Sequence, residues 1–355
     1  MMKQDIAKLD KNFAECGIAN KEEYVWYSAD DKRFDIRGLA VHTDGTYIRM
    51  PEEALTDKSE GVQNLARHTA GGRVRFRTSA EKLAFYVENP SAFHMNHMPQ
   101  TGISGIDVYV NGVFGASFRP ANISAVFSEG EMVLSGKVNN IEIGMPLYNG
   151  VRHLYIGVPK GKKILPAKPY KVDTPVVYYG SSITQGGCAS RPGNSYQGFI
   201  SRHLKADYIN LGFSGNAKGE ETMARYIASL NMSAFIMDYD HNAPNMAHLE
   251  ATHEPFFKII RAAHPSLPII MVSRPNIWSK GEDGRDDIVR KTYENAVAAG
   301  DTNVWYISGK KLFGTSDRED CTVDRCHPND LGFYRMAQAI EPVLKAALKK
   351  NGYKV

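Results

Sequence analysis

The hydrophobic pattern of this chain changes near residue 170, and this change constrains the fold more than any other feature. Before it, short runs alternate apolar and polar residues between Gly, Asn and Pro turns, at 73–77, 83–87, 106–110 and 140–145. A period of two is typical of strands that bury one face. Asn111-Gly112 predicts a two-residue hairpin turn between 110 and 113. The first part of the chain is therefore predicted to be a β-sandwich of the jelly-roll-like kind.

After the proline-bearing segment 166–169, apolar strands alternate with helices. The predicted strands are 176–179, 208–211, 234–237, 268–272 and 304–307, and the predicted helices begin near Tyr196, Glu220, Ala247, Asp286 and Leu331, the last one ending near Lys349. This alternation predicts a parallel sheet with helices on both faces, which is the α/β fold class. A chain of 355 residues with 43% hydrophobic residues is long enough for two cores. We predict one domain over 1–168 and a second over 169–355.

A serine stands where the first strand of the predicted parallel sheet ends. Gly180, Ser181 and Ser182 follow the apolar run 176–179. A strand that ends in Gly-x-Ser before a helix can hold a serine hydroxyl at the carboxyl edge of a sheet, close to backbone N–H groups that stabilise an oxyanion. Taken alone, such a turn is also a common strand-to-helix connection. Ser182 is therefore a candidate nucleophile that needs partners.

The partners are predicted in a loop before the C-terminal helix. Asp324 and His327 are three residues apart there. At this spacing the carboxylate can accept a hydrogen bond from one imidazole nitrogen while the other nitrogen faces a serine from elsewhere in the chain. Taken alone, Asp324 could also cap a turn and His327 could lie on the surface. Together with Ser182, the pair indicates nucleophilic catalysis.

Four short motifs then occur in the order found in the SGNH (GDSL-type) hydrolases, which this sequence resembles. They are Gly180-Ser181-Ser182, the segment 210–216, the segment 238–245, and Asp324 to His327. The resemblance covers about residues 174–350 and implies a flavodoxin-like, three-layer α/β/α hydrolase domain. Residues 105–109 (Gly-Ile-Asp-Val-Tyr) resemble the Gly-x-Asp-Leu-Tyr signature of a two-domain bacterial subgroup with a β-sandwich in front.

The resemblance also implies roles for individual residues. Ser182, Asp324 and His327 are implied as catalytic residues, and the oxyanion hole as the backbone N–H groups of Ser182 and Gly215 with the side chain of Asn242. Asn245 is the alternative side-chain donor. This sequence departs from the family pattern in two places, because Ser181 replaces the usual aspartate and Asn242 lacks a glycine two positions before it. The local turn at Asn242 must therefore differ from that of the family.

These features predict a serine esterase that removes acetyl or other short acyl groups from carbohydrate substrates through an acyl-serine intermediate, with no metal or cofactor. The carbohydrate part follows from the family resemblance and from the leading sandwich. Two alternatives stay open. One is a hydrolase of thioesters or lysophospholipids, and the other is a catalytically inactive carbohydrate-binding protein on the same fold.

Residues that contact the substrate are harder to predict. Arg191 follows the nucleophile turn closely, and Trp278 could also line the pocket, although a loop arginine or a lone tryptophan is often structural. His94 and His97 form a His-x-x-His pair. Because no third ligand is evident, we interpret them as part of a sandwich loop, which could reach the crevice, rather than as a metal site.

Charge and composition limit the classes of partner. The formal net charge of +4 is spread over interspersed acids and bases, so the sequence predicts a small-molecule or oligosaccharide ester as substrate and no nucleic acid. The first ten residues are charged, and no apolar run is long enough for a membrane span, which predicts a cytoplasmic protein, or a secreted one if a leader has been removed. The sequence leaves open whether the protein forms a homo-oligomer.

Four cysteines at this length do not form a disulfide framework, so reduced thiols are expected. They are Cys16, Cys188, Cys321 and Cys326. The last two flank Asp324, at a spacing that could close a small ring in an oxidising compartment. That pairing is left open.

Overall fold

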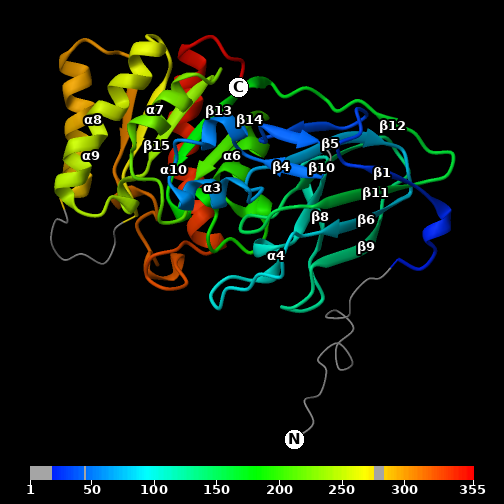
Figure 1. Cartoon of the computed structure of the whole chain (residues 1–355). Helices are drawn as coiled ribbons and strands as arrows, with labels where there is room; N and C mark the ends of the chain where they lie inside the picture. Colours follow the sequence, from blue (N-terminus) through cyan, green and yellow to red (C-terminus); the bar gives the residue numbers. More distant parts are fainter. Residues whose placement is uncertain (1–17, 44, 276–283) are drawn as a thin grey trace, which may run out of the picture.

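Two antiparallel sheets make up the first part of the computed structural model, which describes residues 18–43, 45–275 and 284–355 (Figure 1). One sheet has the strand order β1-β11-β6-β9, and the other has the order β12-β5-β10-β7-β8, with β2 paired to β5. Their bounds, with those of the small hairpin β3-β4, are β1 (Tyr24–Ser28), β2 (Asp35–Arg37), β3 (Val41–Thr43), β4 (Thr46–Ile48), β5 (Arg73–Thr78), β6 (Lys82–Glu88), β7 (Ile106–Val110), β8 (Val113–Phe118), β9 (Phe127–Val133), β10 (Asn139–Gly144), β11 (His153–Pro159) and β12 (Ile164–Leu165).

Alternate residues of these strands point inward and form one apolar core. Phe76, Phe85 and Ile156 are fully buried between the two sheets. The hairpin predicted at Asn111-Gly112 is confirmed, since Val110 pairs with Val113 and both turn residues have positive φ, 54° and 85°. The β-sandwich prediction is therefore confirmed.

A five-stranded parallel sheet forms the second part, in the order β14-β13-β15-β16-β17. Numbered from the first of these strands, the order is 2-1-3-4-5, which is the flavodoxin-like arrangement predicted. The strand bounds are β13 (Val172–Gly180), β14 (Ala206–Gly212), β15 (Ala234–Asp238), β16 (Ile269–Val272) and β17 (Val304–Ile307). The helix bounds are α5 (Ser182–Gln185), α6 (Tyr196–Leu204), α7 (Glu221–Ala228), α8 (Met246–Ala263), α9 (Arg285–Ala298) and α10 (Asp330–Lys350).

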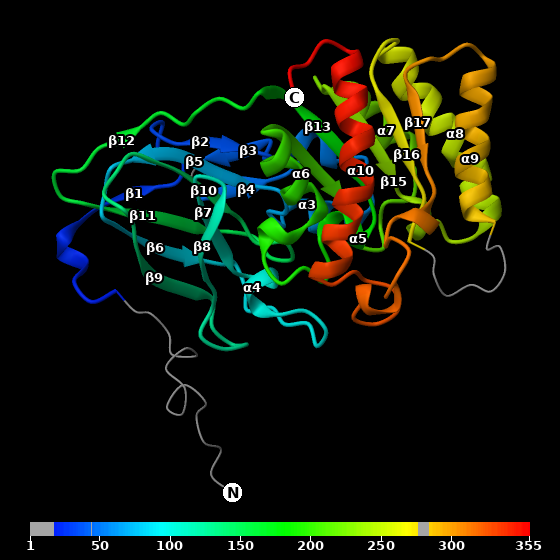
Figure 2. The same ribbon diagram turned by 180° about the vertical axis from the view of Figure 1, so that it is seen from behind.

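Helices cover both faces of this sheet (Figure 2). Strand β13 shows why, because its side chains alternate between the two layers. Val176 and Tyr178 pack with α6 and α10, whereas Val177 and Tyr179 pack with α7 and α8. The three-layer α/β/α prediction is confirmed, and the predicted ends of the helices and strands agree closely with the observed ones except at the start of β13.

Two short helices of the first part do not belong to the sandwich. They are α2 (Glu52–Leu55) and α3 (Glu60–Ala66), and Leu55 and Val62 are buried in the same apolar cluster as Leu211 of the parallel sheet. The chain thus reaches across to the α/β layer well before residue 168. The sequence pattern did not indicate this packing, and the domain boundary at 168/169 stays a prediction.

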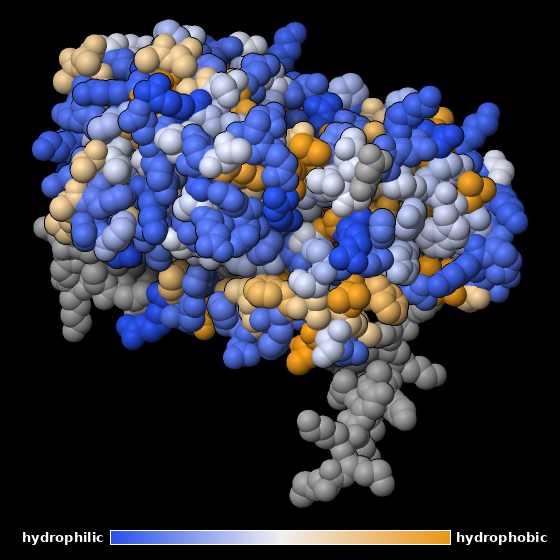
Figure 3. Space-filling model, in the orientation of Figure 1, coloured by the Kyte–Doolittle hydropathy of each residue, from blue (hydrophilic) through white to orange (hydrophobic). Residues whose placement is uncertain are grey.

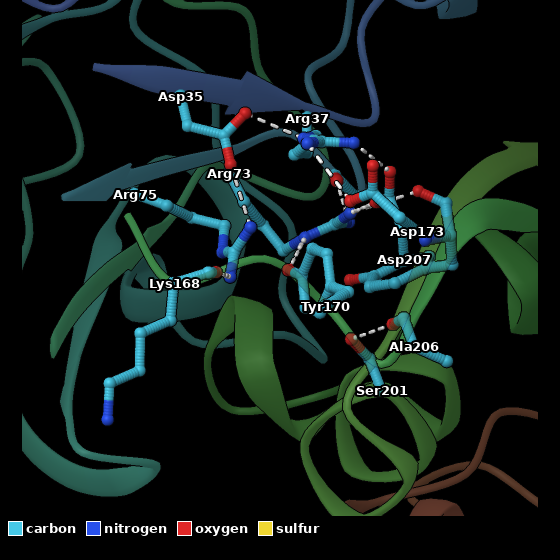
Figure 4. Close-up of polar contacts among 12 residues, drawn as sticks. Asp35, Arg37, Arg73, Arg75, Lys168, Tyr170, Asp173, Ser201, Ala206 and Asp207 are labelled. Carbon is cyan, nitrogen blue, oxygen red and sulfur yellow. Dashed lines mark hydrogen bonds and ion pairs between the residues drawn. The ribbon is translucent and has the colours of Figure 1, made fainter. Parts of the chain in front are cut away.

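An ionic network joins the two parts, as Figure 4 shows. The carboxylate of Asp207, at the start of β14, pairs with Arg73 of β5 and with Arg37 of β2. Arg37 also pairs with Asp173 of β13 at 3.1 Å. The Arg73 guanidinium lies over the ring of Tyr208, 3.8 Å from its centroid. The sandwich is therefore held against the β14 edge of the parallel sheet by charged hydrogen bonds.

A second contact between the parts is a fully buried arginine. The Arg49 guanidinium donates to the carbonyls of His68 and Leu65 at 2.9 and 2.6 Å, and to those of Asn210 and Gly212 at 2.9 and 2.7 Å. Burial lowers the pKa of Arg49 to about 9, so the side chain stays charged at neutral pH. This one residue ties the end of α3 to the carboxyl end of β14.

The surface in Figure 3 is mostly hydrophilic, with apolar residues gathered along its lower edge. Among the described residues, no helix combines the length and the apolar character needed to cross a membrane.

Candidate active site

Ser182, His327 and Asp324 form a hydrogen-bonded chain. Ser182 Oγ lies 3.0 Å from His327 Nε2, and His327 Nδ1 lies 2.7 Å from Asp324 Oδ2. Although 145 positions separate Ser182 and His327 in sequence, the fold brings them together at the carboxyl edge of the parallel sheet. In this arrangement His327 can take the proton of the serine hydroxyl, and the Asp324 carboxylate can stabilise the imidazolium that forms.

The turn that carries Ser182 is built from small residues. Ser182 is the first residue of α5, and the Ser181 hydroxyl caps this helix by accepting from the Ile183 N–H at 3.2 Å. Gly180 is needed because a Cβ there would lie 2.2 Å from the Asp238 carbonyl oxygen. Strand β13 can therefore pass close to β15 and present Ser182 at its end.

The loop that carries Asp324 holds this carboxylate with three N–H donors. Besides the imidazole, the backbone N–H groups of His327 and Cys326 donate to Asp324 Oδ1 at 2.7 and 3.0 Å. Partial burial raises the pKa of Asp324, but these hydrogen bonds outweigh it and hold the pKa below its usual value. The carboxylate is therefore ionised and oriented toward His327 at neutral pH.

A thiol and a second histidine lie beside this chain. Cys326 Sγ lies 3.3 Å from His241 Nε2, and His241 belongs to a short turn after β15. Burial opposes ionisation of Cys326, but hydrogen bonds to His241 and His327 lower its pKa to about 6. The Cys326 hydrogen bond and the Asp324 carboxylate raise the pKa of His327 to about 9 against the effect of burial.

The loops that would bind an oxyanion lie at the same edge. Gly215 follows β14 with a φ of 68°, and no described residue accepts a hydrogen bond from its N–H. Its predecessor Ser214 is fixed by its N–H, which donates to Gln185 Oε1 at 3.0 Å. Asn242 follows β15, and its amide donates to the Phe213 carbonyl at 2.9 Å, which leaves its second amide hydrogen available.

Asn245, the alternative donor, has a structural use. Its side chain accepts from the His248 N–H at 2.8 Å and caps α8. A side-chain oxygen held in this way orients the residue toward the helix. The assignment of Asn242 as the side-chain donor, with Asn245 as the alternative, stays a prediction.

A loop of the sandwich reaches the site. His97 lies with its ring centroid 5.6 Å from that of His327, and the Tyr148 hydroxyl donates to the Ser182 carbonyl at 3.2 Å. The interpretation of His94 and His97 as part of a sandwich loop agrees with this placement. His97, Cys188 and His327 could hold a metal ion, as could Asp324, Cys326 and His327, but either ion would compete with the His327 hydrogen bonds described above.

The remaining predicted residues lie in different surroundings. The Arg191 guanidinium stacks on Phe114 of the sandwich at 3.9 Å and donates to Asn194 at 2.8 Å, so it connects the two parts of the molecule. Trp278 and Cys16 lie outside the described residues. The thiols of Cys188, Cys321 and Cys326 are free.

The sequence indicated no catalytic role for His241 or for Cys326, which it offered only as a possible disulfide partner of Cys321. The only signal available was their position, since His241 adjoins Asn242 and Cys326 adjoins His327. Neither position by itself reveals that the two side chains meet.

Each of the two parts of the chain matches a known protein family. Residues 173–345 match the GDSL-like lipase/acylhydrolase family, and residues 24–164 match the N-terminus of SGNH-type esterases. No curated protein matches the chain.

Solved structures of similar fold include three that cover almost the whole chain. A protein from Bacteroides ovatus described as a GDSL-like lipase is 27% identical, with a TM-score of 0.81, over 92% of this chain and 98% of that one. A salicylyl-acyltransferase from a tetracycline biosynthetic pathway is 21% identical, with a TM-score of 0.78, over 94% and 99%. An acetyl xylan esterase from the rumen bacterium Butyrivibrio proteoclasticus is 12% identical, with a TM-score of 0.60, over 94% and 100%.

The two family matches follow one another along the chain in the same order as the sandwich and the parallel sheet. Both the fold and the matched segments agree with the resemblance seen in the sequence. The chain is therefore a two-domain member of the SGNH (GDSL-type) hydrolases and a carboxylic ester hydrolase.

Proposed function

We propose that this protein is a serine esterase that removes acetyl or other short acyl groups from carbohydrate substrates. The observation that carries the proposal is the hydrogen-bonded chain from Ser182 through His327 to Asp324, with distances of 3.0 and 2.7 Å. For its location, the proposal keeps the prediction of a cytoplasmic enzyme, or of a secreted one if a leader has been removed.

In the first half-reaction, His327 Nε2 takes the proton of the Ser182 hydroxyl as Oγ attacks the ester carbonyl. Asp324 holds the imidazole in the tautomer that presents Nε2 as a base and stabilises the imidazolium. When the tetrahedral intermediate collapses, the imidazolium gives its proton to the departing alcohol oxygen and an acyl-serine remains. His327 then deprotonates a water molecule, which attacks the acyl-serine carbonyl. When this second tetrahedral intermediate collapses, the carboxylic acid leaves and the imidazolium returns its proton to Ser182 Oγ.

The oxyanion of each tetrahedral intermediate would be bound by three donors: the N–H groups of Ser182 and Gly215 and the amide of Asn242. Two observations support this assignment: the Gly215 N–H has no acceptor among the described residues, and Asn242 lies directly after β15. Loss of one such donor costs on the order of 3 kcal/mol of transition-state stabilisation.

The substrate class rests on two lines of support. The acetyl xylan esterase of similar fold acts on an acetylated polysaccharide, as its name states. In addition, the His97 ring centroid lies 5.6 Å from that of His327, and a side chain this close to the reacting groups would leave more room for a short acyl group than for a long chain.

Acyl-length and carbohydrate specificity test this proposal. We expect p-nitrophenyl acetate to be hydrolysed at least about tenfold faster, in kcat/KM, than p-nitrophenyl octanoate. Acetylated xylo-oligosaccharides are expected to release acetate, measured by an enzyme-coupled assay, with Ser182→Ala as the blank. Preference for octanoate or for an acyl thioester would instead favour the hydrolase of thioesters or lysophospholipids.

The Cys326 thiol is expected to control the pH dependence. Only neutral His327 can accept a proton, and a group with a pKa of about 9 is neutral in roughly one molecule in a hundred at pH 7. Cys326→Ser removes the thiolate that favours the imidazolium, so the pKa of His327 falls and the acid limb of the kcat/KM profile moves to lower pH. At pH 7, kcat/KM of Cys326→Ser is therefore expected to be a larger fraction of its own maximum at high pH than in the wild type.

The titratable groups close to His327 are Asp324, Cys326, His97 and Cys188, and His241 lies beside Cys326. His97→Ala serves as the matched control, because it removes a neighbouring ring and keeps the thiol. An acid limb that is unchanged in Cys326→Ser would contradict the thiolate–imidazolium pairing.

A further inference from the structure

An open hollow of about 300 Å³ lies on the sandwich, far in sequence from the Ser182 turn. Its lining residues are Lys21, Trp26, Tyr86, Glu129 and Tyr155. The strand period explains their orientation, since Phe85 and Ile156 point into the sandwich core and their neighbours Tyr86 and Tyr155 point the opposite way. The hollow therefore occupies the outer face of the sheet β1-β11-β6-β9. We call it the aromatic cradle.

The rings of the aromatic cradle are held in place before any ligand binds. Tyr86 and Tyr155 are directly opposite each other on β6 and β11, with ring centroids 6.3 Å apart. The Trp26 indole donates to the Lys21 carbonyl at 3.2 Å. Its ring lies over Gly157, where a Cβ would come within 3.1 Å of Trp26 Cη2. Glycine at this position is what allows the indole to lie against the sheet.

Polar groups stand only at the rim of the aromatic cradle. Lys21 Nζ pairs with Glu129 Oε2 at 2.5 Å, so the rim carries one charge of each sign. The hydroxyls of Tyr86 and Tyr155 have no hydrogen-bond partner among the described residues. Flat apolar faces with a few donors and acceptors at their edge are typical of a small-ligand site.

We propose that the aromatic cradle binds a neutral oligosaccharide. A pyranose ring has an apolar face of C–H groups, which matches the tryptophan and tyrosine faces, and a border of hydroxyls, which matches the tyrosine hydroxyls, the carboxylate and the ammonium. A charged ligand would have to disrupt the pair between Lys21 and Glu129. An acyl chain would leave the hydroxyls of Tyr86 and Tyr155 without hydrogen-bond partners.

This site goes beyond the proposed esterase function, because binding here does not require chemistry at Ser182. It would hold one part of an oligosaccharide on the sandwich while another part of the same oligosaccharide enters the active site at Ser182. Either the cradle or the esterase proposal can fail while the other stands.

Isothermal titration calorimetry of the full chain with xylohexaose and cellohexaose tests the cradle. We expect saturable binding of at least one of them and a Kd weakened by about tenfold or more in Trp26→Ala and in Tyr86→Ala. Hydrolysis of p-nitrophenyl acetate should stay at the wild-type rate in both variants. Circular dichroism confirms that each is folded, and Tyr86→Ala serves if loss of Trp26 unfolds the sandwich.

Tyr334→Ala is the matched control, because Tyr334 is an exposed tyrosine on α10, away from the cradle. Its Kd should equal that of the wild type. Absence of saturable binding to both probes would overturn the proposal, as would binding that both cradle variants retain. Dimerisation that Trp26→Ala abolishes, without oligosaccharide binding, would assign the cradle to a second copy of the chain and also overturn it.

Discussion

Ser182→Ala is expected to lower kcat for p-nitrophenyl acetate by about 10⁴-fold or more. The variant keeps the fold but removes the oxygen that lies 3.0 Å from His327 Nε2, so no acyl-serine can form. His327→Ala should cause a loss of similar size, because the hydroxyl is a poor nucleophile without its base. Since the two residues act as a unit, the double variant should lose little more than either single one.

Ser181→Ala is the matched control for this experiment. It also removes a serine hydroxyl from the turn, but this hydroxyl only caps α5 by accepting from the Ile183 N–H. We expect a cost of about 1 kcal/mol in stability and a rate within about tenfold of the wild type. Equal activity in Ser182→Ala and Ser181→Ala would remove Ser182 from the mechanism. Absence of hydrolysis in the folded wild type as well would favour the catalytically inactive binding protein.

Arg49→Met is expected to lower the free energy of unfolding by at least about 3 kcal/mol. Methionine fills much of the same space, but it leaves the buried carbonyls of Asn210 and Gly212 and the partly buried carbonyls of Leu65 and His68 without their donor. Urea denaturation at 25 °C, followed by circular dichroism, measures the change. Because β14 leads directly to Gly215, we also expect a lower kcat for p-nitrophenyl acetate in the folded variant.

Arg67→Met provides the comparison for the arginine experiment. Arg67 stands just after α3, but its side chain is exposed and its partner Glu52 is exposed too. Exposed pairs contribute little, so the free energy of unfolding should change by less than about 0.5 kcal/mol. A similar small change in Arg49→Met would show that the buried guanidinium does not hold α3 against β14.

Local patterns determined much of this protein. The two-residue period up to residue 145 predicted the sandwich, and Asn111-Gly112 predicted its hairpin, because strand period and turn geometry depend on neighbouring residues. The apolar runs at 176–179 and 234–237 predicted β13 and β15 for the same reason. Their carboxyl ends fix where Ser182 and Asn242 stand, and the spacing of Asp324 and His327, taken together with Ser182, predicted their hydrogen bond.

Only the tertiary structure decided what surrounds Ser182, His327 and Asp324. The contact of Cys326 with His241 and the approach of His97 to His327 join segments far apart in sequence. The packing of α3 on the parallel sheet and the four carbonyls around Arg49 are contacts of the same kind. No local period encodes them, because they depend on how whole layers are placed against one another. The sequence by itself determined the elements and the reacting groups, and the packing of the two parts decided what surrounds those groups.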